Sequence, residues 1–165
     1  MRLLYLLTLP LYLLDQVTKI AILRTFEEHA SREVIPGFFN LVRVHNRGIA
    51  FGRFNEGAAS NVIFTIVAVT ALIAILIFWA RGAFPGKLNG TAVALLVSGI
   101  LGNLTDRLWH GYVVDFLDFH VAGHHWPSFN VADSCICVAA GLLFIAAFRP
   151  EHKEKDKDQA EPEES

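Results

Sequence analysis

Two aspartates, Asp115 and Asp133, stand near the ends of the stretch VVDFLDFHVAGHHWPSFNVAD, which runs between strongly apolar segments. Two carboxyl groups that lie close together cannot both ionise cheaply, so they share one proton as a coupled pair. The ionised member can take a proton from water while the protonated member polarises a scissile carbonyl. Such a pair would hydrolyse a peptide bond without a covalent nucleophile, provided that the fold brings the two side chains together.

The two aspartates differ in what could hold them in place. Asp115 follows two valines and has no cation near it in the sequence, so its partner must come from another part of the fold. Asp133 lies at the expected start of a helix, where a carboxylate also suits the helix dipole. An ionisable group at the edge of the hydrocarbon costs about 2.5 to 3.5 kcal/mol on insertion scales, so each is expected to face protein or water.

Four other charged residues also admit a purely structural interpretation. Asp15 and Lys19 stand at i and i+4, in the favourable order for an ion pair on a helix. Asp106 lies one helical turn after Asn103, and Arg107 can extend to the membrane interface. The four charges could pair with one another and fix helix packing, or they could support the chemistry of the aspartates. The sequence leaves both possibilities open.

A metal site is the next alternative. Its candidate ligands would be His120, His124, His125, Cys135 and Cys137. This set lacks any standard zinc spacing, and Ser128 and Ser134 lack a histidine placed as a paired base. The sequence therefore predicts no metal and no cofactor.

The composition indicates a membrane protein. The chain has 165 residues, of which 53% are hydrophobic, too many for an ordinary soluble domain. Four segments approach the length of about 20 residues that crosses a hydrocarbon core, at about 3–23, 62–80, 90–107 and 131–148. We therefore expect an all-α membrane protein with four transmembrane helices. The net charge of −2, without a basic stripe, argues against a nucleic-acid partner.

The expected topology gathers the polar helix ends on one side of the membrane. With four spans, both termini share a side and the two long connections share the other. The short loop 81–87 and the basic flank of the last helix favour cytoplasmic termini, which places the polar cluster on the periplasmic side. The charged segment 150–165 is expected to be a disordered cytoplasmic tail after a membrane domain over 1–149.

The first long connection is expected to form a small extramembrane β-hairpin. Residues favourable to strands fill the region of about 33–54, and they flank a plausible turn at His45-Asn46-Arg47-Gly48. The segment 108–130 is expected only as a connection. Its aromatic residues, with Trp109, would contribute to an interfacial belt.

Five ordered motifs resemble one family, the bacterial lipoprotein signal peptidases, or signal peptidase II, which are four-helix intramembrane aspartyl proteases. The motifs are DQVTK (15–19), HNRGIAFG (45–52), GNLTDR (102–107), VVDF (113–116) and FNVAD (129–133). The likeness runs from the first helix through the fourth. It departs at Asn46-Arg47-Gly48, where the family often has Asn-Thr-Gly, and at Ser98-Gly99, where it often has Gly-Gly.

The resemblance implies roles for the matching residues. Asp115 and Asp133 correspond to the catalytic pair. The residues that would bind substrate or inhibitor are Asn46, Asn103, Arg107 and Asn130, and those that would support the site are Asp15, Lys19, Asp106 and Gly48. No role is carried over to Asp118.

The resemblance also implies a substrate and a location. Family members remove the signal peptide from diacylglyceryl-modified prolipoproteins, cleaving on the N-terminal side of the lipidated cysteine, and globomycin inhibits them. The expected setting is the bacterial cytoplasmic (inner) membrane, with membrane lipid around the chain and the active site near the periplasmic face. The protein is expected to be a monomer.

Two other functional classes remain open on sequence. A small proton- or ion-coupled transporter also needs intramembrane charges, but it predicts polar groups toward both faces of the membrane. A non-catalytic assembly subunit would use the polar cluster for helix packing and would tolerate asparagine at positions 115 and 133.

Overall fold

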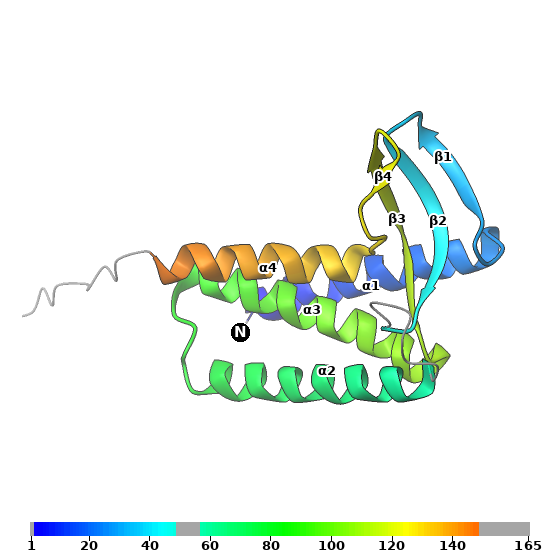
Figure 1. Ribbon diagram of the computed structural model, residues 1–165. Coiled ribbons are helices and arrows are strands. Elements are labelled where there is room, and N and C mark those ends of the chain that lie inside the picture. The colour runs from blue at the N-terminus through cyan, green and yellow to red at the C-terminus, as the bar shows by residue number, and fades with distance from the viewer. Residues whose placement is uncertain (1, 49–56, 149–165) are drawn as a thin grey trace, which may run out of the picture.

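The structure is a computed structural model that describes residues 2–48 and 57–148. Within these ranges helices and strands follow one another along the chain, with the helices forming a bundle and the strands a sheet at one end of it (Figure 1). The helices are α1 (Arg2–Thr25), α2 (Gly57–Ala80), α3 (Gly86–His110) and α4 (Val131–Ala147), and the strands are β1 (Ser31–Ile35), β2 (Phe39–Asn46), β3 (Val113–Val121) and β4 (His124–His125).

Three helices are long and apolar enough to cross a membrane. These segments are Tyr5–Thr25, Ala59–Ala80 and Gly86–His110, and they overlap three of the four predicted spans. Helix α4 is apolar but has 17 residues, at the short end of what a hydrocarbon core of roughly 30 Å requires. Membrane character is therefore confirmed for three helices, and the fourth span stays a prediction.

Helix α3 is the centre of the bundle, and it packs against α1, α2 and α4 (Figure 1). Glycine permits the closest of these contacts. A Cβ at Gly99 would collide with the backbone oxygen of Ala132, and a Cβ at Gly102 would collide with the carboxylate of Asp15. These two positions let α4 and α1 approach the α3 backbone, which brings polar side chains of three helices together.

Helix α2 has a different environment. Its only element contact within the described part of the chain is with α3, and apolar side chains such as Val62, Ile63 and Ile66 stay more than half exposed. An apolar helix surface of this kind is suited to lipid.

The sheet is antiparallel, with the strand order β1-β2-β3-β4. It closes over the end of α1, where Ile22, Val114 and Phe116 form a buried apolar cluster. Strand β3 was not predicted, although VVDFLDFHV is rich in β-branched and aromatic residues. Asp115 therefore lies in a strand opposite Val44 rather than in a loop.

The predicted hairpin is observed, but the turn that joins β1 to β2 lies at Pro36-Gly37, before the predicted turn at His45-Asn46-Arg47-Gly48. Strand β2 ends at Asn46, and the residues that would follow a turn at 45–48 lie outside the described part of the chain, so that turn stays a prediction. In the turn from β1 to β2, Gly37 has φ +71°, and the N–H of Phe38 donates to the carbonyl of Ile35 at 3.1 Å. Proline followed by glycine at positive φ is the type II pattern. The predicted β region from 49 to 54 and the tail 150–165 lie outside the described residues.

Candidate active site

Asp115 is a buried carboxyl group held between two amides. It is 2% exposed. The Nδ2 group of Asn46 donates to its Oδ2 at 2.8 Å, and the Nδ2 group of Asn130 donates to its Oδ1 at 2.8 Å. Burial, and after it the nearby charge of Asp133, raise the pKa of Asp115 to about 7, against the lowering effect of the two amides. Asp115 can therefore carry a proton at neutral pH.

Asp133 is fixed by the start of α4. Asn130 is the N-cap of this helix and Asp133 its third residue. The backbone N–H of Asp133 donates to Oδ1 of Asn130 at 2.9 Å, and the backbone N–H of Asn130 donates to Oδ2 of Asp133 at 3.3 Å. This reciprocal capping box satisfies two N–H groups that a helix start leaves free. It also holds a half-buried carboxylate where the helix dipole favours a negative charge.

Two asparagines connect the aspartates. The Nδ2 group of Asn103 donates to Oδ1 of Asp133 at 2.7 Å. Asn130 donates both to Oδ1 of Asn103 at 3.2 Å and to Asp115. The amides thus form a continuous path from Asp115 through Asn130 and Asn103 to Asp133. The predicted convergence of these residues, drawn from α3, β3 and α4, is observed.

A buried ion cluster lies behind this path. The Nζ of Lys19 contacts Oδ2 of Asp15 at 2.9 Å and Oδ2 of Asp106 at 3.0 Å. It also donates to Oδ1 of Asn103 at 3.0 Å, so that its three N–H groups have three acceptors. We call Asp15, Lys19 and Asp106 the ion cluster. These three charges therefore pair with one another, as the structural interpretation predicted. The amide of Asn103 joins the ion cluster to the aspartates.

The ion cluster also holds the backbone next to each aspartate. The backbone N–H of Ala132, the residue before Asp133, donates to Oδ1 of Asp15 at 2.8 Å. The backbone N–H of Val114, the residue before Asp115, donates to Oδ2 of Asp106 at 3.0 Å. A charge-assisted hydrogen bond of this kind is stronger than one between neutral groups. Two carboxylates that share one lysine therefore position the main chain on which both aspartates stand.

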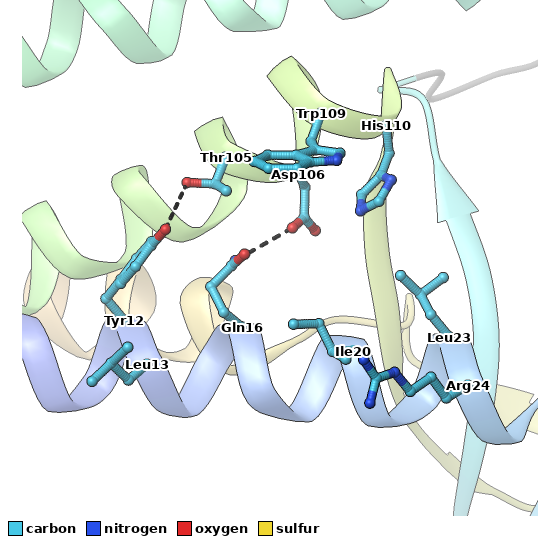
Figure 2. Close-up of a pocket in the computed structure, with 10 residues that line it drawn as sticks. All are labelled: Tyr12, Leu13, Gln16, Ile20, Leu23, Arg24, Thr105, Asp106, Trp109 and His110. Carbon is cyan, nitrogen blue, oxygen red and sulfur yellow. Dashed lines mark hydrogen bonds between the residues drawn. The ribbon is translucent and has the colours of Figure 1, made fainter.

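Gln16 belongs to the same assembly, and the sequence reasoning missed it. Its Nε2 donates to the carbonyl of Gly102 at 3.2 Å and approaches the carboxylates of Asp15 and Asp106 at 3.1 and 3.4 Å. Figure 2 shows Gln16 on α1 reaching across to Asp106 on α3. The available signal was its position inside DQVTK, between two residues to which a role was assigned.

Asn46 and Gly48 form the entrance to Asp115. Gly48 has φ +79°, and its N–H donates to Oδ1 of Asn46 at 2.8 Å. With Oδ1 occupied in this way, Nδ2 of Asn46 is directed at Asp115. A cavity of about 370 Å³ lies beside this pair, and its lining includes His45, Asn46, Asp115 and Ser128. The buried carboxyl group is therefore reachable from outside the protein.

Arg107 lies on the last turn of α3 beside the aspartates. Its guanidinium is half-buried, lies 5.5 Å from the centre of the Phe64 ring and is within electrostatic range of Asp133 and Asp115. It makes no ion pair with any described residue. Of the charges that could have paired with one another, Arg107 is the one that stays available to a bound molecule.

His45 supports the strand that carries Asn46. Its Nδ1 lies 2.9 Å from Oε1 of Glu28, and its Nε2 accepts from Nε of Arg43 at 3.1 Å. Burial lowers the pKa of His45, the Arg43 charge lowers it further, and Glu28 opposes this effect. A neutral ring satisfies both contacts, because Nε2 must accept when Arg43 donates.

The remaining polar candidates lie elsewhere. Asp118 contacts Nδ1 of His125 at 2.8 Å and accepts from Nδ2 of Asn40 at 2.8 Å. Burial would raise the pKa of Asp118, but these two contacts outweigh it and lower the pKa. Cys135 and Cys137 lie on α4, one buried and one exposed. Among the described residues, no three side chains of histidine, cysteine, aspartate or glutamate converge as a metal site would need.

Comparison with known proteins identifies close relatives. Residues 7–149 match the family described as signal peptidase (SPase) II. The lipoprotein signal peptidase of Ralstonia nicotianae is 52% identical over 139 residues, which is 83% of this chain and 79% of the relative. That of Alteromonas mediterranea is 41% identical over 151 residues, or 91% and 82% of the two chains.

Two solved structures of bacterial membrane enzymes are also similar. One has a TM-score of 0.78 at 34% identity, and the match covers 95% of this chain and 94% of the other. The second has a TM-score of 0.79 at 35% identity, covering 88% and 92%. The helix bundle with its terminal sheet is therefore an arrangement that membrane enzymes share.

Proposed function

Because the chain belongs to the signal peptidase II family, it is a membrane protease with signal peptidase II function, and we propose that Asp115 and Asp133 are its catalytic carboxyl groups. The proposal rests on one observation. Asp115 is a buried carboxyl group with a pKa of about 7, and it lies beside a second carboxylate. A group with a pKa near the working pH can both hold and release a proton, which is what acid–base hydrolysis requires.

The two aspartates take different roles. Asp115 holds the shared proton and donates a hydrogen bond to the scissile carbonyl. Asp133, half-buried at the helix start, is the ionised member and takes a proton from the attacking water. The water oxygen bonds to the carbonyl carbon, the carbon–nitrogen bond then breaks, and the departing amine receives a proton from the pair. No covalent intermediate with the protein forms.

The amides and the arginine position the reactants. Asn103 and Asn130 fix the carboxyl groups relative to each other, because each amide contacts one aspartate directly. Asn46 lies at the entrance and Arg107 beside the two aspartates, and both bind the substrate backbone or an inhibitor such as globomycin. The ion cluster and Gly48 support the site without touching the substrate. Such fixed donors and acceptors lower the cost of reorganisation during the reaction.

The substrate is a diacylglyceryl-modified prolipoprotein, cleaved on the N-terminal side of its lipidated cysteine. The acyl chains of such a substrate lie in the bilayer, so the scissile bond is presented near the membrane surface. Asp115 lies on β3 and Asp133 in the first turn of α4, and these two elements come together where the helix bundle meets the sheet, which suits that depth (Figure 1). The sheet would hold the peptide part from the aqueous side.

The membrane arrangement follows from the same proposal. Helix α4 is the fourth span, the sheet side faces the periplasm, and both termini lie in the cytoplasm of a bacterium with the protein as a monomer in its inner membrane. Arg81 and Lys87 flank the short connection from α2 to α3, as expected for a cytoplasmic loop. Cysteine labelling from outside intact cells tests this, with Ser31→Cys on β1 accessible and Lys87→Cys protected.

The proposal is tested by cleavage of a purified diacylglyceryl-prolipoprotein. Asp115→Asn and Asp133→Asn are expected to lose at least about 10³-fold in kcat/KM, as expected when an acid–base group is removed. Asp118→Asn is the matched control, because it removes a carboxylate from the same strand at a distance from the pair. Globomycin should block the wild type.

Two results would contradict the proposal. Cleavage at the wild-type rate by a folded Asp115→Asn or Asp133→Asn protein would make that residue structural. Equal loss in Asp118→Asn would show that the assay reports damage to the sheet. A transporter predicts no cleavage at all, and a non-catalytic subunit predicts that the asparagine variants behave as the wild type.

A further inference from the structure

A second cavity, separate from the entrance to Asp115, lies between α1 and α3. It has a volume of about 540 Å³ and is lined from Leu13 to Arg24 on α1 and from Thr105 to His110 on α3. Figure 2 shows the two helices on either side and the polar bridge from Gln16 to Asp106 across it. We call this cavity the α1–α3 groove. It reaches the ion cluster from the side of Gln16, whereas the aspartates are joined to that cluster through Asn103.

The groove has an apolar wall and a cationic end. Leu13, Ile20 and Leu23 supply apolar side chains along α1. Arg24 and His110 lie at the end nearest the sheet, and Trp109, which precedes His110 on α3 and is 82% exposed, has its ring over Asp106 (Figure 2). Tryptophan at this position is typical of the boundary between hydrocarbon and headgroups. The groove therefore runs from the bilayer interior to its surface.

Arg24 is available to an anion. It forms no ion pair within the described part of the chain, and Glu28, four residues further along the sequence, is bound by His45. The Asp106 carboxylate lies deeper in the groove, where Lys19 compensates its charge. The anion-binding end of the groove is thus separated from its one acidic lining residue.

The length of the groove fits one leaflet of a bilayer. From Leu13 to Arg24 the helix rises roughly 16 Å at 1.5 Å per residue, about half of a hydrocarbon core of roughly 30 Å. A molecule with its anionic end at Arg24 and an apolar chain extending to Leu13 would fill it. We propose that the α1–α3 groove binds one anionic phospholipid of the surrounding membrane, with its phosphate at Arg24 and His110 and an acyl chain against Leu13, Ile20 and Leu23.

The test measures lipid contact rather than activity. With Trp79→Phe and Trp126→Phe, Trp109 is the only tryptophan left. The protein is placed in phosphatidylcholine bilayers that contain a small fraction of brominated phosphatidylglycerol or, separately, the same fraction of brominated phosphatidylcholine. The anionic lipid is expected to quench Trp109 with roughly fivefold higher apparent affinity, the factor that one arginine at an anionic surface contributes.

Two variants distinguish the groove from the general surface charge. Arg24→Gln should abolish the preference for the anionic lipid. Ile20→Phe should weaken it, because the larger side chain occupies the part of the α1–α3 groove in which the acyl chain would lie. Arg32→Gln is the matched control, because Arg32 is an exposed arginine on β1 outside the groove. It should keep the preference.

Four outcomes would overturn the proposal. Equal quenching by both brominated lipids would remove the anionic selectivity. Loss of the preference in Arg32→Gln would assign it to surface charge, and displacement by soluble glycerol phosphate would assign it to a free-phosphate site. Displacement by a diacylglyceryl-modified substrate would assign the groove to the proteolytic reaction. The proposal does not rest on the roles of Asp115 and Asp133, so its failure would leave their proposed roles unaffected, and the reverse also holds.

Discussion

Two neighbouring pairs of carboxylates lie in this region of the protein, and only one of the pairs contacts a lysine. Asp15 and Asp106 are 1% and 3% exposed, and both contact Lys19. Asp115 is 2% exposed, yet it contacts amides and has Asp133 as its charged neighbour. Burial is thus similar for Asp15, Asp106 and Asp115, whereas only Asp15 and Asp106 contact a cation. A carboxylate that contacts a cation holds the backbone as a hydrogen-bond acceptor, whereas burial without such a contact raises the pKa of Asp115.

The largest effect on stability is expected when the compensation is removed. Lys19→Met leaves two buried carboxylates without their cation, which should cost about 3 to 5 kcal/mol in the free energy of unfolding. Unfolding in mixed micelles, monitored by circular dichroism, measures the loss. A cost below about 1 kcal/mol would mean that the cluster does not hold the helices together.

The pH dependence of stability separates Asp115 from the ion cluster. Because its folded pKa is raised above 3.8 to about 7, the folded state binds the proton more tightly. The stability from this group is complete below pH 3.8 and is lost as the pH rises through about 7. Between pH 4 and 8 the wild type should lose up to about 4 kcal/mol more than Asp115→Asn does. The melting temperatures of both proteins, measured across this pH range, test this. If they fall by the same amount in both proteins, the raised pKa is not that of Asp115.

A smaller loss of stability is expected when the helix packing that brings the two groups together is disturbed. Gly102→Ala places a methyl group against the Asp15 carboxylate and Ala132. Overpacking of this kind costs about 1 to 3 kcal/mol, and it should also lower activity because Asp15 holds the backbone before Asp133. Gly141→Ala on α4, where a Cβ meets no atom within 4 Å, is the control: it should leave activity unchanged and should not lower stability, because alanine favours a helix over glycine.

The smallest effect is expected at Asp118, a buried carboxylate outside both groups. Asp118→Asn weakens its contact with His125 and should cost about 1 kcal/mol, with cleavage close to the wild-type rate. Cleavage and thermal unfolding measured on the same preparation test this. A large loss of activity without a loss of stability would give Asp118 a role in the reaction.

The convergence of the polar side chains could be predicted better than the sheet. Asn103, Asn130 and Asp133 stand in short motifs at the ends of apolar segments, and the topology of the helices brings such ends together. Their roles in catalysis stay a prediction. The bonds from Asp15 to the Ala132 backbone and from Asp106 to the Val114 backbone could not be predicted. They depend on how closely three helices approach, which no single segment specifies.

The sheet could be predicted only in part. The turn of the β1–β2 hairpin at Pro36-Gly37 was not predicted, although proline followed by glycine is a strong turn signal. Strand β3 was missed because its residues lie between two predicted spans and carry two aspartates, which are depleted in strands. Burial of Val114 and Phe116 against Ile22 outweighs that preference.

The most direct test of the difference between the two groups is a titration of Asp115 itself. Infrared difference spectra of the wild type against Asp115→Asn isolate its carboxyl band, and the band is followed from pH 4 to 9. We expect a protonated carboxyl that titrates near pH 7, with a lower midpoint in Asp133→Asn because the neighbouring charge is removed. A band that is already ionised at pH 5, or that does not respond to Asp133→Asn, would contradict a shared proton between these two aspartates.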